Sequence, residues 1–99
     1  MVLITGAIVA TEANFDRIRE LSLEHVQRSR TEGGCEHHAV HVDAENPFRL
    51  VFLERWLDTA AVLKHFSDPQ VRQFARTVRE LAAEPPTIEI YEANRIKLP

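Results

Sequence analysis

The chain has 99 residues, of which 44% are hydrophobic and 27% are charged, and its formal net charge at pH 7 is −3. This length predicts a single domain over residues 1–99 with a thin core, because a chain of this size buries only about 60–68% of its unfolded surface. The negative charge gives no general attraction to nucleic acid or to an anionic membrane, so we expect neither as a partner.

Cysteine usage and hydropathy argue against a disulfide-rich, membrane-spanning or secreted protein. Cys35 is the one cysteine, which argues against a disulfide scaffold and is typical of a reducing compartment. No apolar run approaches the roughly 20 residues of a membrane span. Residues 1–11 begin apolar but lack a basic leading segment and continue into Glu12, so we interpret them as a strand and not as a signal peptide. We therefore expect a cytoplasmic protein.

The first third of the chain predicts a strand followed by a helix. Val2–Ala10 is a short apolar run, partly β-branched, which is typical of a strand. Thr11 or Asn14 can cap a helix that continues to about Thr31. We expect Gly33-Gly34 to end this helix, because a Gly pair can take the left-handed cap conformation.

One face of this helix mixes apolar and polar side chains. On a 100° wheel the shared face contains Phe15, Ile18, Ser22, His25, Val26 and Ser29. A helix that buries this face carries three polar side chains inward, and buried polar groups need partners. Two interpretations stay open: the hydroxyls bond back to the helix while His25 meets a buried acceptor, or the polar patch lines a ligand pocket.

The centre of the chain predicts a sheet that is apolar on both faces. Cys35–Asp43 alternates as a second strand, and Ala44–Pro47 forms the turn into the central strand, which opens the stretch Phe48–His65. One face of the central strand carries Phe48, Leu50, Phe52, Glu54 and Trp56, and the other carries Arg49, Val51, Leu53, Arg55 and Leu57. A small domain covers one face with its own helices, so we expect a second copy on the other: a homodimer through the sheet face.

Two further helices and a last strand follow. Asp58 or Thr59 caps the first helix, and Asp68-Pro69 is a strong start signal for the second. The second helix presents an apolar stripe of Val71, Phe74, Ala75, Val78, Leu81 and Ala82. Its other side carries Arg72, Arg76 and Arg79, which we interpret as a solvated face. Pro85-Pro86 ends it, and Thr87–Ile96 predicts the final strand.

The resulting order is β-α-β-β-α-β, with the second helix broken at Ser67–Pro69. This is the ferredoxin-like pattern of the α+β class: a four-stranded antiparallel sheet with its helices on one face.

Glu54 is the main candidate for chemistry, because an ionisable group in an apolar strand needs a partner. His25 and His65, on the helices expected over the same face, are available, and His38 can join them. Either Glu54 is a buried structural anchor, or Glu54 and a histidine form an acid–base pair beside a pocket roofed by Trp56. The candidate catalytic residues are thus His25, Glu54 and His65, and the candidate substrate-binding residues are Ser22, Ser29, His38 and Trp56.

Five histidines raise the question of a metal. His37 and His41 share a strand face but lie about 13 Å apart along it, too far to bind one zinc ion easily. No established metal-binding spacing is present. A site drawn from His25, His65 and Glu54 across the fold is an alternative, but our prediction is no metal and no cofactor.

The helix end, HxxxSRxExGC, and the strand-to-helix stretch, ExWxDxxxxxxH, together resemble the antibiotic biosynthesis monooxygenase (ABM) family. The residues that carry the resemblance are His25, Ser29-Arg30, Glu32, Gly34-Cys35, Asp43, Glu54, Trp56, Asp58, His65 and Phe74. The resemblance implies a dimeric α+β barrel, in which two sheets pack face to face and each subunit has a cavity between sheet and helices. His25, Glu54, Trp56 and His65 are the site residues that carry over.

Members of that family include cofactor-independent oxygenases of quinols and polyphenols, haem-degrading enzymes and an isomerase. The resemblance to the haem-degrading branch fails at two places, since the first strand has no Asn and Val71–Leu81 has no His. Three hypotheses follow. The protein is a cofactor-independent monooxygenase of a small quinol-type aromatic, with molecular oxygen as co-substrate; or a proton-transfer isomerase or lyase of a small oxygenated metabolite; or a non-enzymatic dimeric ligand-binding protein.

Overall fold

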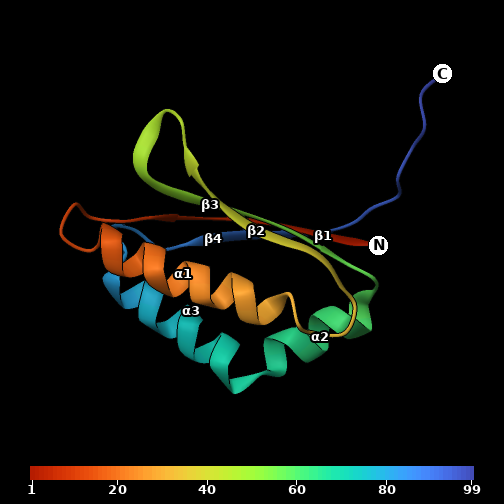
Figure 1. The fold of residues 1–99 in the computed structure, drawn as a ribbon, viewed down its shortest axis with the longest axis horizontal. Coiled ribbons are helices and arrows are strands. Elements are labelled where there is room, and N and C mark those ends of the chain that lie inside the picture. Colours follow the sequence, from red (N-terminus) through yellow and green to blue (C-terminus); the bar gives the residue numbers. More distant parts are fainter.

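The computed structural model describes all 99 residues. Its elements are β1 (Val2–Val9), α1 (Phe15–Ser29), β2 (Cys35–Asp43), β3 (Asn46–Trp56), α2 (Thr59–Ser67), α3 (Pro69–Leu81) and β4 (Thr87–Glu92). The strands form one antiparallel sheet in the order β2-β3-β1-β4, and the helices all lie on one face of it (Figure 1). This confirms the predicted ferredoxin-like α+β fold, including the break between α2 and α3.

Side-chain caps fix where the helices begin. The Asp58 carboxylate accepts a hydrogen bond from the backbone N–H of Ala61, and the Asp68 carboxylate accepts one from Gln70. Both predicted starts are therefore confirmed. Two hydrogen bonds hold the start of α1. Thr11 Oγ1 accepts one from the backbone N–H of Asn14, and the Asn14 side chain donates the other to the carbonyl of Leu81 at the end of α3.

The predicted end of α1 was wrong. The helix ends at Ser29, with Arg30 as a right-handed cap residue, so the Gly pair does not end it. Gly34 is instead the one residue with positive φ, at 84°, in the turn before β2. A Cβ at Gly34 would lie 2.6 Å from the Cβ of Ala61. The turn therefore needs glycine both for its backbone conformation and for the close approach of α2.

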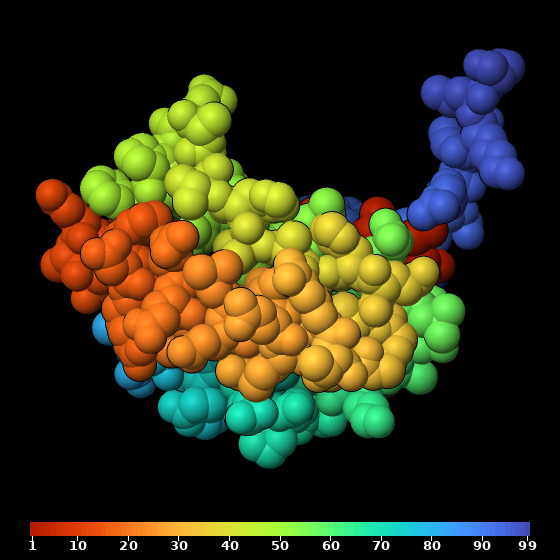
Figure 2. Space-filling model, viewed as in Figure 1, coloured from red at the N-terminus to blue at the C-terminus, as the bar shows by residue number.

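Two strand boundaries also differ from the prediction. β3 begins at Asn46, inside the segment predicted as a turn. β4 ends at Glu92 and not at Ile96, because its partner β1 begins at Val2, directly opposite Glu92. The segment after β4 projects away from the body of the molecule (Figure 2).

The core lies between the sheet and the helices and forms two clusters. The larger one contains Ile8, Ala10, Ile18, Val26, Leu50, Phe52 and Val78, and the smaller one contains Val2, Ile4, Trp56 and Val62. In α3 only Val71 and Val78 of the predicted stripe are buried; Phe74 is half-buried and Ala75 is exposed. The predicted arginine face of α3 is exposed, as expected.

The opposite face of the sheet carries no helix (Figure 1). Val51 is half-buried there, while Leu53 is 42% exposed and Tyr91 is 48% exposed. β4 is an edge strand that pairs only with β1, and all 6 of its residues are exposed. None of the helices is both long and apolar enough to cross a membrane.

Candidate functional site between the sheet and the helices

A β-bulge in β2 places His38 beside Glu54. Cys35 pairs with Trp56 and His37 pairs with Arg55, so Glu36 is the extra residue between two consecutive pairs. The next pair is His38 with Glu54. Because the bulge adds one residue, His38 and not His37 points to the helix side of the sheet.

Glu54 is only 6% exposed, and two groups contact its carboxylate. The indole N–H of Trp56 donates to Oε1 at 2.9 Å. His38 Nε2 lies 3.2 Å from the same oxygen, without hydrogen-bond geometry. Burial raises the pKa of this carboxyl, but His38 and Trp56 favour its charged form and bring the pKa below its ordinary value. Glu54 is therefore ionised at neutral pH. Of the three histidines considered as its partners, His38 contacts the carboxylate, whereas His25 and His65 are not hydrogen-bonded to it.

His65 pairs with a different carboxylate, Glu32, which lies in the turn after α1. His65 Nδ1 is 2.8 Å from Glu32 Oε2. An ionised carboxylate only accepts hydrogen bonds, so this contact places a proton on Nδ1 and leaves the lone pair on Nε2. Glu32 was not among the predicted site residues, although it belongs to the ExGC segment that carries the family resemblance.

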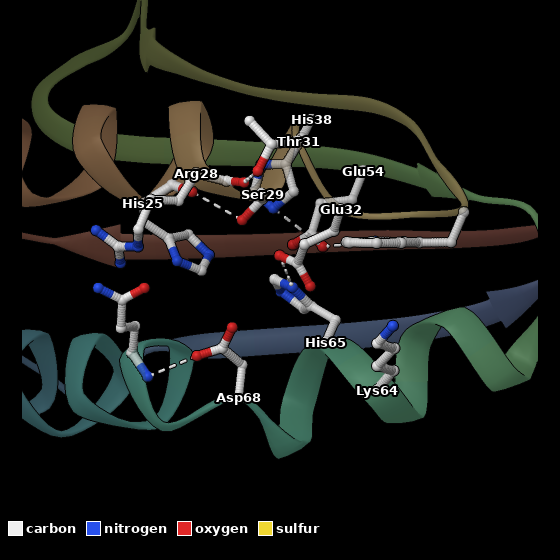
Figure 3. Close-up of polar contacts among 12 residues, drawn as sticks. His25, Arg28, Ser29, Thr31, Glu32, His38, Glu54, Lys64, His65 and Asp68 are labelled. Atoms are coloured by element: carbon white, nitrogen blue, oxygen red, sulfur yellow. Dashed lines mark hydrogen bonds and ion pairs between the residues drawn. The ribbon is translucent and has the colours of Figure 1, made fainter.

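His25 completes a group of three histidine rings (Figure 3). Its ring lies 5.2 Å from the His38 ring and 5.5 Å from the His65 ring, and it stacks on Phe74 with centroids 4.1 Å apart and planes 5° apart. Burial, followed by the proximity of His38 and His65, lowers the pKa of His25 to about 3. His25 is thus neutral at pH 7.

The two serines on the same face of α1 are both buried. Ser29 Oγ donates to the carbonyl of His25 at 2.7 Å, which is the back-bond that one interpretation of this face predicted. Ser22 Oγ has no hydrogen-bond partner in the protein. Cys35 packs against the smaller core cluster, and burial raises the pKa of its thiol.

A cavity of about 210 Å³ opens between α3 and the β1–β4 side of the sheet. Its polar lining residues are the three candidate catalytic residues, His25, Glu54 and His65, together with Arg72, Arg79 and Thr87. Its other walls are mostly apolar and include Ile8, Phe52, Phe74, Val78 and Ile88. Gly6 also lines it, in the row of β1 between Phe52 and Ile88, so the missing side chain keeps the floor of the cavity open.

The four candidate substrate-binding residues do not line this cavity. Trp56 is 0% exposed and packs with Val2, Ile4 and Val62, so the expectation of a pocket roofed by Trp56 was wrong. Ser22, Ser29 and His38 lie behind the wall, buried between α1 and the sheet. The structure therefore brings together one layer of side chains that faces the cavity and a second layer that supports it.

Comparison with known proteins places this arrangement in a family. Residues 1–77 match the family model described as antibiotic biosynthesis monooxygenase. The chain belongs to the ABM family. A curated relative is the uncharacterized protein sll1783 of Synechocystis sp., 28% identical over 91 residues. The match covers 92% of this chain, and the chain spans 62% of that relative's length.

Solved structures agree with the ABM assignment. A candidate antibiotic biosynthesis monooxygenase from Deinococcus radiodurans has a TM-score of 0.93 and 26% identity, covering 99% of this chain and 97% of its own. The structure of Rv0793 from Mycobacterium tuberculosis has a TM-score of 0.88 and 20% identity, and the match covers 96% of each chain. This second similarity is one of fold. Membership of the ABM family supports a monooxygenase-like function.

Proposed function

We propose that this protein is a cofactor-independent monooxygenase of a small, electron-rich aromatic compound of the quinol type. The observation that carries the proposal is the cavity: its walls are largely apolar, and His25, Glu54 and His65 are grouped on its lining, which also includes Arg72 and Arg79 of α3. An apolar cavity of about 150 Å³ already holds benzene, so a volume of about 210 Å³ accommodates one substituted ring.

His65 is the best placed general base. Glu32 holds its Nδ1–H at 2.8 Å, which orients the ring and leaves Nε2 to take the phenolic proton of a bound quinol. Glu54, ionised and on the cavity wall, stabilises the imidazolium that forms. His25 is neutral, and a pKa of about 3 makes it a weak base, so its role is to hydrogen-bond and position the substrate.

The chemistry then balances without a metal or a flavin. The phenolate transfers one electron to O₂, and the radical and superoxide combine to form a C–O bond to a ring carbon. The His65 imidazolium then returns its proton to the peroxide anion and gives the hydroperoxide. Loss of water from the resulting hydroperoxide leaves one oxygen atom in a hydroxyquinone and the other in water. The apolar walls exclude bulk water from the reactive anion.

The test is oxygen uptake by metal-free protein with a panel of substituted quinols. Turnover above the buffer rate is expected. His65→Gln should lower kcat about 10²-fold or more, the usual contribution of a general base, and Glu32→Gln should give a smaller loss. The matched control is His41→Gln, which changes an exposed histidine of β2 and should leave the rate unchanged. No turnover above buffer would overturn the proposal, whereas turnover of an oxygenated metabolite without O₂ would favour the isomerase alternative.

We also propose that two copies pack through the helix-free face of the sheet, where Leu53 and Tyr91 are about half exposed. Apolar groups on an uncovered sheet favour association. Light scattering should give a mass of about two chains. Leu53→Asp should reduce this mass to one chain, while Leu63→Asp, which changes an exposed leucine on α2, should not.

A cytoplasmic location is proposed from the free thiol of Cys35, because reducing compartments keep such thiols unpaired. The proposed partner besides the second copy is a small-molecule substrate, and the net charge of −3 argues against nucleic acid and anionic membranes.

A further inference from the structure

The three buried histidines bring together an unusual number of nitrogen atoms. One ring nitrogen from each of His25, His38 and His65 lies within 4.8 Å of the other two. The residues come from α1, β2 and α2, so the grouping exists only in the fold and follows no motif of the sequence. All three side chains are at least nine-tenths buried.

Several of these nitrogens have no hydrogen-bond partner in the protein. His25 Nδ1 and His38 Nδ1 are buried without a partner, and His38 Nε2 has only its 3.2 Å contact with Glu54 Oε1, which lacks hydrogen-bond geometry. Buried polar atoms are rarely left in this state, because losing water without gaining a partner costs free energy. A metal ion would provide a partner for these buried nitrogens, because it accepts lone pairs from several ligands at one point.

The surroundings of the three rings are those of a metal site. Glu32 holds His65 Nδ1 at 2.8 Å, and a carboxylate on the far nitrogen of a ligating histidine is the usual supporting contact at zinc sites. The Phe74 ring stacks on His25 and fixes its plane. Glu54 lies beside the group with its carboxylate held by Trp56, and its negative charge offsets that of a cation.

We propose that His25, His38 and His65 together bind one divalent first-row transition metal ion of the zinc type. Imidazole ligands suit zinc, copper, nickel and iron. Zinc–nitrogen bonds of about 2.0–2.1 Å in tetrahedral geometry place the nitrogens about 3.4 Å apart. The nitrogens lie within 4.8 Å of one another, so binding requires side-chain rotations that bring them closer together. His25 and His65 line the cavity, so the fourth coordination position faces it, as in zinc sites that bind a small molecule.

This site goes beyond the proposed oxygenation and does not depend on it. A metal bound to His65 Nε2 occupies the lone pair that would accept the phenolic proton. Metal loading and proton abstraction therefore exclude each other at this nitrogen. The metal-loaded protein should have lost its oxygen uptake, and a chelator should restore it.

Binding is tested on the full chain without a histidine tag, stripped with a chelator and free of substrate. Calorimetry with Zn²⁺ should give one ion per chain, and Co²⁺ should give the intense visible bands of a tetrahedral site. His25→Gln, His38→Gln and His65→Gln should each weaken binding more than about 100-fold, since loss of a supporting contact alone costs 10–100-fold. Glu32→Gln should fall in that smaller range, and His41→Gln should bind as the wild type does.

A second measurement uses the wild-type protein, so it does not depend on whether the variants fold. In the wild-type protein, NMR of the histidine ring nitrogens should show three rings shifting together as Zn²⁺ is added, while the exposed His37 and His41 stay unchanged. Absence of Zn²⁺ binding at micromolar concentrations, or binding that His41→Gln abolishes, would overturn the metal site. Oxygen uptake in the presence of chelator is a separate readout, so failure of one proposal leaves the other to be judged on its own.

Discussion

The hydrogen bond between Trp56 and Glu54 can be tested by removing its two members separately and together. Glu54→Met leaves the indole N–H buried with no acceptor, and Trp56→Phe leaves the carboxylate without its one hydrogen-bond donor at 2.9 Å. Each single change should be destabilising, because an orphaned buried partner keeps its full desolvation cost. The double variant replaces both groups with apolar ones and should lose less than the sum of the two.

The expected coupling energy follows from the geometry. A hydrogen bond to a charged group contributes about 1.5–3 kcal/mol, and both partners are buried here, Trp56 at 0% and Glu54 at 6% exposure, so solvent screens the pair weakly. For a domain of this size about 1 kcal/mol shifts Tm by 4–8 °C, so the coupling should be visible in thermal melts. Urea unfolding of all four proteins at pH 7, with chelator present, gives the cycle. Additivity within about 0.5 kcal/mol would refute the reasoning.

The same coupling should depend on pH in a defined direction. The pKa of Glu54 is below its ordinary value of 4.5 in the folded protein, so the unfolded chain binds the proton more readily. The stabilisation is then fully present above about pH 4.5 and is lost as pH falls through the lower folded-state pKa. A coupling that grows on acidification would contradict an ionised Glu54.

Two further predictions concern single residues. Asp58→Ala should lower the free energy of unfolding by about 1 kcal/mol, because the carboxylate no longer accepts the N–H of Ala61; chemical denaturation measures this, and Glu36→Ala, an exposed acid outside any cap, is the control. Cys35 should react slowly with iodoacetamide at pH 7.5, because partial burial raises the pKa of its thiol and keeps the thiol protonated. Mass spectrometry should show faster labelling in denaturant, and equal rates in both conditions would contradict the shielding of this half-buried thiol.

The elements could be predicted where their signals are local. Asp58 and Asp68 each accept a backbone N–H within three residues, so a short stretch of sequence contains both the cap and the helix it starts. The end of β4 was predicted wrongly because it depends on a partner: β1 begins at Val2, and past this residue the backbone hydrogen bonds extend only to the pair Met1 and Ala93. Nothing near Glu92 in the sequence carries that information.

In the candidate site, too, the local features could be predicted and some contacts between distant segments could not. Alternation in β3 placed Glu54 and Trp56 on the helix face, and the helical wheel placed His25 there, and the structure agrees. Alternation in β2 also indicated that His38 can lie beside Glu54, and the structure pairs these two residues. The pairing of Glu32 with His65 was missed, since it joins a turn to a distant helix.

The edge position of β4 has a consequence for how the cavity admits a ligand. The strand is hydrogen-bonded on one side only and carries the Ile88 wall of the cavity. The free energy of local opening is lowest for strands with few neighbours and exposed side chains. Its outward-facing amides should therefore exchange with deuterium ahead of those in β1 and β3. Local opening of this strand widens the cavity at Ile88, whereas Glu54 lies on the central strand β3 and His25 and His65 lie on the helices.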